Sequence, residues 1–320
     1  MAAPQYHAPR WLTNPHLQTI YGSLFAAKPD VRYHRERWET PDGDFIDVDH
    51  VDGVSGHTWV VLFHGLEGSS DSGYARMLMH RARERGWRGS VVNFRGCSGE
   101  PNRLPRAYHS GDSGEIDWVL RRFKSRAGDR PLYAAGISLG GNALLKWLGE
   151  RRGEAATVVH RAAAVSAPLD LMAAGEALGR GFSLVYAKHF LATMKANAAA
   201  KHARFPNAFD LARMRRSRTL REFDDVVTAP LHGYRDTDDY WTRASAKPLL
   251  RDIAVPTLVL NARDDPFLPE RALPAPDEVS PAVTVEFPSR GGHVGFVSGP
   301  FPGHIGWLPA RLLHFFDHQE

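Results

Sequence analysis

The sequence predicts an α/β protein with a mostly parallel, doubly wound sheet and a helical insertion. Short apolar runs alternate with helical patterns through the first half of the chain. Such alternation is typical of parallel strands joined by right-handed crossovers. It stops at residues 169–247, where almost every segment has a helical pattern, and then resumes. We therefore expect a core formed by residues 1–168 and 248–320, with an N-terminal arm at 1–30, and an inserted helical cap at 169–247.

Composition and charge exclude several classes of protein. The 320 residues are 43% hydrophobic and 24% charged, with a formal net charge of +4; this is an ordinary globular balance with no signature of a nucleic-acid partner. The single cysteine, Cys97, excludes an internal disulfide, and residues 1–19 contain no apolar signal-peptide core, so we expect a cytoplasmic protein. No apolar run approaches the ~18 residues of a membrane-spanning helix.

Two antiparallel strands are predicted near the N-terminal edge of the sheet. Residues 35–39 and 45–50 flank a Pro-Asp-Gly turn, which is a typical hairpin connection. In the second strand apolar residues alternate with Asp47 and Asp49. We therefore expect one apolar face and one face in water.

The remaining elements follow from continuous apolar runs, which favour buried parallel strands, and from apolar positions at helical spacing. The strands are expected at residues 59–63, 90–94, 132–135, 157–159 with 162–166, 256–260 and 282–287, and the helices at 74–85, 112–125, 142–148 and 308–318. A short helix at 11–20 is expected to cover an edge of the core, and we find no chemical role for His16.

The residues Gly-Ile-Ser-Leu-Gly at 136–140 stand between a predicted strand and a predicted helix. This context is typical of a nucleophile elbow, in which a strained turn exposes a serine hydroxyl above the sheet. Glycines on both sides let the strand and helix approach closely. Ser138 is thus the candidate nucleophile, and the backbone amide of Leu139 is a candidate donor to an oxyanion.

A second loop, His-Gly-Leu-Glu-Gly at 64–68, follows the strand at 59–63. A glycine-rich loop at a strand end can turn its backbone amides toward a cavity. With the elbow downstream, we expect the amide of Leu66 to be the second oxyanion donor. The alternative is a simple glycine turn in which His64 packs locally.

The candidate acid and base follow Ser138 in the order Ser, Asp, His, as in α/β-hydrolases. His293 comes soon after the last strand and can take the serine proton, while a carboxylate orients its imidazole. We prefer Asp265, because it begins an acid–Pro–apolar loop, although Asp264 remains an alternative. His304 lies in a similar Gly-His-x-Gly context but nearer the terminal helix, so His293 is preferred.

Other reactive residues have simpler interpretations. Cys97 has no partner pattern around it and is expected to be a packed loop residue. Five arginines between 213 and 221 are expected on a solvated face, with contact to anionic lipid head groups as the alternative. Residues 236–239 resemble part of a calcium loop but lack its glycine and terminal glutamate. We expect neither a metal nor a cofactor.

With these motifs in view, the sequence resembles the YheT-like branch of the α/β-hydrolase superfamily, which has eukaryotic abhydrolase-domain relatives. The resemblance extends along nearly the whole chain and is carried by residues 14–19, 64–69, 93–99, 136–142, 264–267 and 292–296. It implies an α/β-hydrolase fold and a cytosolic or membrane-peripheral serine hydrolase acting on esters. Relatives are linked to carboxylesterase, phospholipase-type and acyltransferase activities.

The predicted function is therefore hydrolysis of carboxylic esters, of short to medium acyl chain or lipid type, through an acyl-enzyme on Ser138. One alternative passes the acyl group to an alcohol, and another is a non-catalytic binding protein on the same scaffold. The expected partner is a small-molecule or lipid ester, with membrane contact through the cap. The sequence leaves the oligomeric state open.

Overall fold

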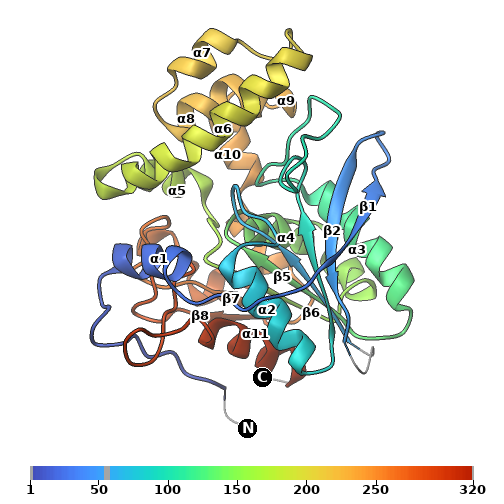
Figure 1. Cartoon of the computed structure of the whole chain (residues 1–320), viewed down its shortest axis with the longest axis vertical. Coiled ribbons are helices and arrows are strands. Elements are labelled where there is room, and N and C mark those ends of the chain that lie inside the picture. Colours follow the sequence, from blue (N-terminus) through green and yellow to red (C-terminus); the bar gives the residue numbers. More distant parts are fainter. Residues whose placement is uncertain (1–2, 54–57, 319–320) are drawn as a thin grey trace.

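The computed structural model of the chain describes residues 3–53 and 58–318. An eight-stranded sheet crosses the molecule, with helices on both faces and a helical layer above one end (Figure 1). This arrangement is the predicted α/β architecture. None of the helices in the described part of the chain combines the length and hydropathy that a transmembrane span requires.

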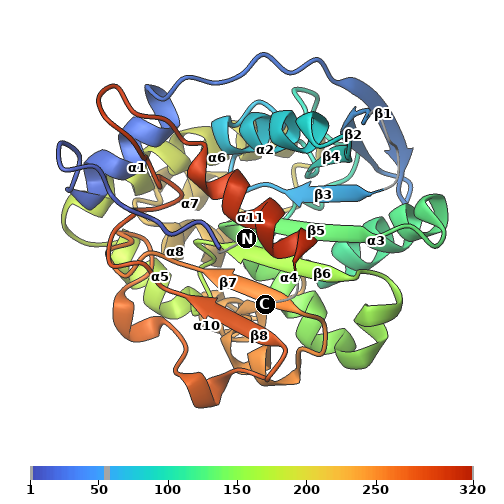
Figure 2. The ribbon, with the colours of Figure 1, turned by 90° about the horizontal axis from the view of Figure 1, so that it is seen from below.

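The sheet has the order β1-β2-β4-β3-β5-β6-β7-β8, which Figure 2 shows from one edge to the other. Strands β1 and β2 are antiparallel to each other, β2 is antiparallel to β4, and all other neighbours are parallel. The strands are β1 (His34–Glu39), β2 (Phe45–Val51), β3 (Trp59–Phe63), β4 (Arg88–Asn93), β5 (Leu132–Ile137), β6 (Arg161–Val165), β7 (Thr257–Leu260) and β8 (Val283–Glu286).

Two apolar layers enclose the sheet, because its central strands are buried on both faces. In β3, Val61 and Phe63 pack in one cluster, whereas Val60 and Leu62 pack in the other. The first cluster includes α3 (Ser113–Ala127) and α4 (Leu139–Arg151), and the second includes α2 (Gly73–Glu84) and α11 (Trp307–Asp317). The continuous apolar run of β3 is thus explained by its two covered faces.

The expectation of a water-exposed face on β2 is wrong. Asp47 and Asp49 are both buried, and each carboxylate receives a two-pronged hydrogen bond from the neighbouring strand, from Arg37 and Arg35 respectively. Burial acts to raise the pKa of Asp49, but hydrogen bonds from its partners outweigh it and hold that pKa below its usual range. Apolar and charged residues do alternate along β2, but charges that are paired and hydrogen-bonded can be buried where single ones cannot.

The strand expected at residues 157–159 is also wrong. Residues 152–157 form a 3₁₀ turn, and the amides of Val158 and Val159 both donate to the carbonyl oxygen of Ala155. Both valines are nevertheless buried in the α3/α4 cluster. Their apolar character therefore reflects packing in this cluster and not pairing in the sheet. Strand β6 begins only at Arg161.

Residues between β6 and β7 are helical, as expected. The helices are α5 (Leu171–Leu178), α6 (Leu184–Arg204), α7 (Leu211–Arg216), α8 (Leu220–Phe223), α9 (Ala229–Leu231) and α10 (Thr237–Ala244). They form the layer at the top of Figure 1 and have an apolar cluster of their own, which includes Met214 and Phe223. Within the arginine-rich stretch, Arg213 pairs with Asp225 and Arg221 with Asp238.

Candidate active site

The predicted nucleophile, Ser138, lies at the turn between β5 and α4. Its backbone has φ 52° and ψ −119°, a strained conformation that costs a non-glycine residue roughly 1–3 kcal/mol and clusters at functional sites. The flanking glycines permit the turn: a Cβ on Gly136 would lie 2.5 Å from the Gly140 carbonyl oxygen, and one on Gly140 2.6 Å from that of His64. The serine is thus held at the C-terminal end of β5, partly exposed.

Ser138, His293 and Asp265 form a continuous hydrogen-bonded chain. His293 Nε2 is 3.0 Å from Ser138 Oγ, and His293 Nδ1 is 2.9 Å from Asp265 Oδ2. The Asp265 side chain is fully buried and the His293 side chain is 10% exposed. A carboxylate at Nδ1 favours the tautomer protonated there, which leaves Nε2 free to accept the serine proton.

The two alternatives from the sequence have different partners. Asp264 Oδ1 accepts a hydrogen bond from the Gly292 amide at 3.0 Å. Burial raises the pKa of Asp264, and the neighbouring Asp265 carboxylate adds to this effect. His304 lies in the loop before α11, where its Nδ1 accepts from the Gly306 amide at 3.2 Å. Each alternative therefore stabilises a loop.

The amide of Leu139 is the first of helix α4, so it points out of the helix N-terminus beside Ser138. The loop at 64–68 approaches the same point, because a Cβ on Gly65 would lie 3.7 Å from Ser138 Oγ. Amide donors at a helix N-terminus favour a nearby negative charge. Both predicted donor segments therefore meet at the serine.

Within the loop at 64–68, neighbouring amides already have acceptors. The Gly65 amide donates to the Tyr74 hydroxyl at 3.0 Å, and the Glu67 amide donates to the Tyr108 hydroxyl at 2.8 Å. Between them, the Leu66 amide donates no hydrogen bond to any described residue. Two tyrosine hydroxyls thus satisfy the flanking amides, whereas the Leu66 amide has no acceptor among the described residues.

His64 holds the conformation of this loop through two hydrogen bonds. It is fully buried; its Nε2 accepts from the Phe94 amide at 3.0 Å, so its Nδ1 carries the proton and donates to the Gly65 carbonyl at 2.7 Å. Burial lowers the pKa of His64 to about 4. It is therefore neutral at pH 7, with both nitrogens engaged, and it holds the loop without acting as a base.

The N-terminal helix α1 (Pro15–Leu24) packs against the loop that carries His293, a relation that the sequence analysis missed. The His293 amide donates to Thr19 Oγ1 at 2.9 Å, and the Thr19 hydroxyl donates to the Pro15 carbonyl at 2.8 Å. A Cβ on Gly292 would lie 2.5 Å from that same carbonyl. The helix and the loop are therefore in close contact at the candidate base.

Gln18 extends this contact along the loop. Its side chain is buried, accepts from the Val297 amide at 3.0 Å and donates to the Leu12 carbonyl at 2.9 Å. Ser166, the residue after β6, accepts a hydrogen bond at Oγ from the Val294 amide at 3.1 Å. Side chains far apart in sequence thus bind successive amides of one loop. The one sequence signal for the α1 residues was their place in the motif at 14–19.

An aromatic cluster stands beside the candidate base. The Phe267 ring stacks on the His293 imidazole, with ring centroids 3.9 Å apart and an interplanar angle of 19°. Tyr186 and Phe190 of α6 contact Phe267, with centroids at 4.9 Å and 5.9 Å. The Tyr186 hydroxyl is 3.3 Å from the His16 carbonyl. The inserted helices and α1 therefore meet next to the triad, and His16 is part of that contact.

Cys97 and residues 236–239 lie outside this arrangement. Burial raises the pKa of the Cys97 thiol, and the residue packs against the core, as expected. Asp236 is the N-cap of α10, where its carboxylate accepts from the Asp239 amide at 2.8 Å. In the described ranges, no three histidine, cysteine, aspartate or glutamate side chains are grouped as metal ligands would be.

Comparison with known proteins identifies the family. The alpha/beta hydrolase fold family matches residues 58–300. YheT of Escherichia coli (strain K12) is 42% identical over 95% of this chain and 90% of its own. Phospholipase ABHD3 of Mus musculus is 32% identical over 97% of this chain and 77% of its own. The chain is a YheT-like α/β hydrolase.

Solved structures agree with this assignment at the level of the fold. The esterase EaEST from Exiguobacterium antarcticum has a TM-score of 0.57 and 17% identity to this YheT-like hydrolase, over 89% of the chain and 100% of its own. The esterase Pf2001 from Pyrococcus furiosus has a TM-score of 0.56 and 14% identity, over 99% and 98%. At such identities the similarity describes architecture alone.

Proposed function

We propose that this YheT-like hydrolase cleaves carboxylic esters through an acyl-enzyme on Ser138. The observation that carries the proposal is the hydrogen-bonded chain from Ser138 through His293 to the buried Asp265. A serine hydroxyl needs such a base to become nucleophilic, and the base needs an oriented imidazole. The relatives named above include a phospholipase, and a monoacylglycerol lipase of Saccharomyces cerevisiae is 28% identical over 82% of this chain.

In the first half-reaction, Ser138 Oγ attacks the ester carbonyl carbon while His293 Nε2 takes the hydroxyl proton. The amides of Leu66 and Leu139 stabilise the negative oxygen of the tetrahedral intermediate. The intermediate collapses by breaking the bond to the alcohol, and the leaving alkoxide receives the proton from His293. Asp265 stabilises the transient imidazolium without taking its proton.

In the second half-reaction, His293 takes a proton from water, and the hydroxide oxygen attacks the acyl carbonyl carbon. The second tetrahedral intermediate uses the same two amides. Its collapse breaks the ester bond to Ser138, and His293 returns the proton to Ser138 Oγ. The products are the carboxylic acid and the free enzyme, so no cofactor is needed.

We further propose that residues 169–247 form a cap that selects the substrate. Phe267 stacks on His293, and two aromatic residues of α6, Tyr186 and Phe190, contact Phe267. The oxyanion loop is tied to the same helix, because Asn197 Nδ2 donates to Glu67 Oε2 at 3.1 Å. An apolar neighbourhood with few polar groups favours an acyl chain. Short- to medium-chain acyl esters and lipid esters are the proposed substrates.

The test is covalent labelling with a fluorophosphonate, followed by mass spectrometry of the labelled peptide. We expect a single adduct on Ser138 and none in the Ser138→Ala variant, which loses ester hydrolysis by about 10⁴-fold or more. His293→Ala should also abolish labelling, whereas the matched control His304→Ala should not. An unlabelled protein with an intact fold would contradict the proposal and favour a non-catalytic binding protein.

A panel of acyl esters of increasing chain length, including lysophospholipids, measures the substrate range. Adding ethanol to the same reactions distinguishes hydrolysis from acyl transfer. We expect free acid as the main product at every chain length. An ethyl ester that forms in preference to the acid would show that an alcohol is the better acceptor.

A further inference from the structure

The exposed apolar surface of this protein is concentrated on three segments. Within residues 3–53 and 58–318, the large apolar side chains that are strongly exposed, by 38% to 74%, are Leu17, Leu24, Phe25, Phe182, Leu184, Val185 and Phe301. We call these seven residues the apolar face. They belong to α1 and the residue after it, to the 3₁₀ turn before α6 with the start of that helix, and to the loop before α11. Exposed apolar side chains that cluster in this way mark an interaction site.

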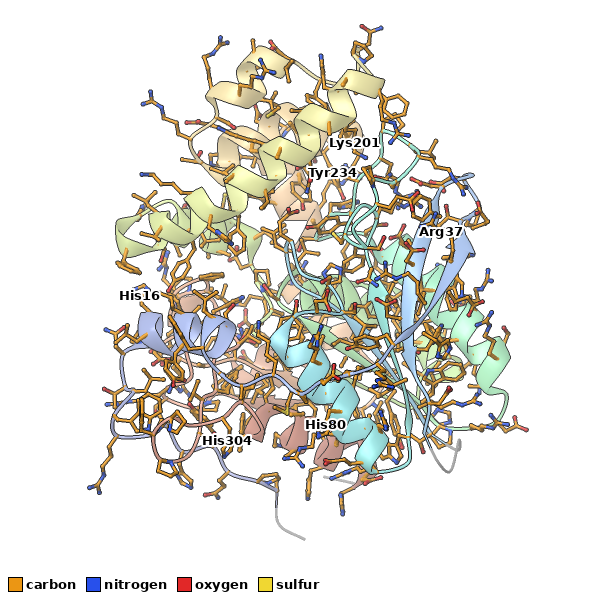
Figure 3. All side chains as sticks on the ribbon, in the orientation of Figure 1. His16, Arg37, His80, Lys201, Tyr234 and His304 are labelled. Carbon is orange, nitrogen blue, oxygen red and sulfur yellow. The ribbon has the colours of Figure 1, made fainter. Side chains whose placement is uncertain are left out.

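The three segments are in contact, so the apolar face is one surface. The His16 ring contacts that of Phe182, with centroids 4.5 Å apart. On the other side of α1, the Tyr21 hydroxyl donates to the Pro302 carbonyl at 2.9 Å, and Trp11 contacts Phe301 at 5.4 Å. Figure 3 shows His16 between α1 and the inserted helices, at the side of the molecule where these segments meet.

Wider segments around the apolar face carry the net positive charge of the chain. Residues 4–30, 179–190 and 288–304 contain one acidic residue and the basic residues Arg10, Lys28, Arg180, Lys188 and Arg290. Their formal net charge is +4, equal to that of the whole chain, so the remaining residues sum to zero. All five basic side chains are exposed. Among described residues, their one ion pair is Arg180 with Glu176 at 4.0 Å.

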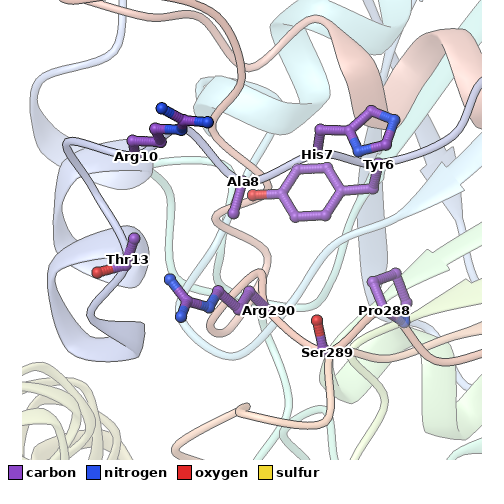
Figure 4. A pocket seen from close by; sticks show the side chains of 8 residues that line it. All are labelled: Tyr6, His7, Ala8, Arg10, Thr13, Pro288, Ser289 and Arg290. Atoms are coloured by element: carbon purple, nitrogen blue, oxygen red, sulfur yellow. The ribbon is translucent and has the colours of Figure 1, made fainter.

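Two of these arginines line a common hollow of about 290 Å³ between the N-terminal arm and the loop after β8. Figure 4 shows the Arg10 and Arg290 side chains on either side of Ala8, and Tyr6 and Ser289 also line the hollow. A guanidinium group can donate two parallel hydrogen bonds to the oxygens of one phosphate. The hollow therefore offers a place for an anionic phosphate group at the margin of the apolar face.

We propose that the apolar face docks this protein on an anionic lipid surface. Its apolar side chains enter the boundary between head groups and acyl chains, while the surrounding lysines and arginines contact lipid phosphates. A second copy of the chain is a poorer occupant, because a symmetric dimer would place two like-charged patches together. The inference rests on the proposed function in one respect, namely that the ester substrate is a lipid.

Docking by this face would bring the candidate active site to the lipid. Helix α1 carries both Leu24 of the apolar face and Thr19, which binds the His293 amide. At the start of α6, Tyr186 follows Val185 and contacts Phe267, which stacks on His293. The aromatic cluster beside the triad is thus continuous with the surface that meets the membrane.

The test measures binding of the full chain to vesicles by flotation. Vesicles of phosphatidylcholine and phosphatidylglycerol in equal amounts are compared with vesicles of phosphatidylcholine alone. We expect binding to the anionic vesicles and its loss at high salt, because exposed charges are screened. The double variant Leu24→Ser/Phe25→Ser should reduce affinity by about 10-fold or more. Lys28→Glu/Lys188→Glu should reduce it by about 10-fold on anionic vesicles only.

The matched control is Arg215→Glu/Arg216→Glu, which reverses the same number of charges on α7, away from the apolar face. This variant should bind as the unaltered protein does. An equal loss of binding in this control would assign docking to the arginine-rich helices and overturn the inference. Absence of vesicle binding by the unaltered protein would overturn it too, as would a Leu24→Ser/Phe25→Ser variant that only converts a dimer to a monomer.

Two activity measurements separate this inference from the proposed function. Leu24→Ser/Phe25→Ser should hydrolyse a water-soluble butyrate ester at the unaltered rate and a lipid ester in anionic vesicles about 10-fold more slowly. Equal rates on the vesicle substrate would overturn the docking inference while leaving ester hydrolysis intact. Vesicle binding without hydrolysis of any ester would instead overturn the proposed function alone.

Discussion

Asp264 and Asp265 are adjacent in the chain, yet they serve different partners. Asp265 binds the His293 imidazole, and its Oδ1 also accepts from the Phe267 amide at 2.8 Å. Asp264 binds the Gly292 amide. Asp265 thus orients the candidate base directly, and Asp264 supports the loop that carries it.

We predict that Asp265→Asn lowers kcat by about 10⁴-fold, because an amide favours the wrong imidazole tautomer. Asp264→Asn is the matched control, since its side-chain oxygen still accepts from the Gly292 amide, and we expect a loss of less than about 10-fold. Steady-state kinetics on one soluble ester compares the two. Equal losses would contradict the assignment of Asp265.

His64 shows how burial fixes the charge of a residue near the site. Its folded pKa of about 4 lies below the value of ~6.5 for an unfolded histidine. Between these values the unfolded chain binds a proton that the folded chain does not. The contribution of His64 to stability is therefore complete above about pH 6.5 and is lost as the pH falls toward 4.

We predict that the difference in the free energy of unfolding between the unaltered protein and the His64→Gln variant becomes smaller as the pH is lowered. A shift from 6.5 to about 4 corresponds to on the order of 3 kcal/mol. Urea unfolding at a series of pH values from about 7 to 4.5 measures the gap between the two proteins. A gap that stays constant with pH would contradict the prediction.

Among the elements, α1 contacts the loop of His293 although it lies near the other end of the chain. Asn14 begins it as an N-cap, accepting from the amides of His16 and Leu17, and Pro15 stands in the first turn. These local signals predict the helix, but they do not predict which part of the chain it contacts. The contact with the loop of His293 comes from Thr19 and Gln18, whose partners lie more than 270 residues away.

We predict that Thr19→Val lowers kcat by about 10-fold with little change in KM, because it leaves the partly buried His293 amide without its acceptor. Thr19→Ser retains the hydroxyl and should restore kcat. As a positioning residue, Thr19 should also alter the pH dependence of kcat/KM, which a purely structural loss would not change. A kcat that is lost in Thr19→Val but kept in Thr19→Ser assigns the effect to the hydrogen bond of the hydroxyl and not to packing.

At the scale of the whole molecule, the inserted helices are fixed to the core through hydrogen bonds of polar side chains. Asn142 of α4 donates to the Ser110 and Ala244 carbonyls, at 2.9 Å and 2.8 Å, and accepts from the Ala246 amide at 3.0 Å. Lys201 of α6 donates to the Leu104 carbonyl of a core loop at 3.0 Å (Figure 3). The elbow helix thus also anchors the end of the insertion.

We predict that Asn142→Ala destabilises the fold by about 3 kcal/mol, since several buried backbone groups lose their partner. Asn142→Asp should also destabilise it, because a carboxylate can accept but cannot donate. Urea denaturation measures both changes. The exposed Asn207→Ala is a surface control and should be nearly neutral.

Local patterns were sufficient for most elements and for the elbow. The continuous apolar run of β3 and the glycines around Ser138 are local signals, because strand burial and close approach of the backbone depend on neighbouring residues. The same reasoning failed for Asp47 and Asp49, whose burial depends on arginines in another strand. It also gave no role to His16, because the partner of His16 is Tyr186 in a distant helix.

The sequence by itself determined the α/β class, the order of the strands along the chain and the identity of Ser138 and His293 as candidates. Only the tertiary structure decided which of two adjacent aspartates binds the imidazole, what holds the loop of His293, and which surface gathers the exposed apolar and positive residues. The physical reason is that propensity and periodicity act over a few residues. Hydrogen bonds and charge clusters join groups that the chain brings together only on folding.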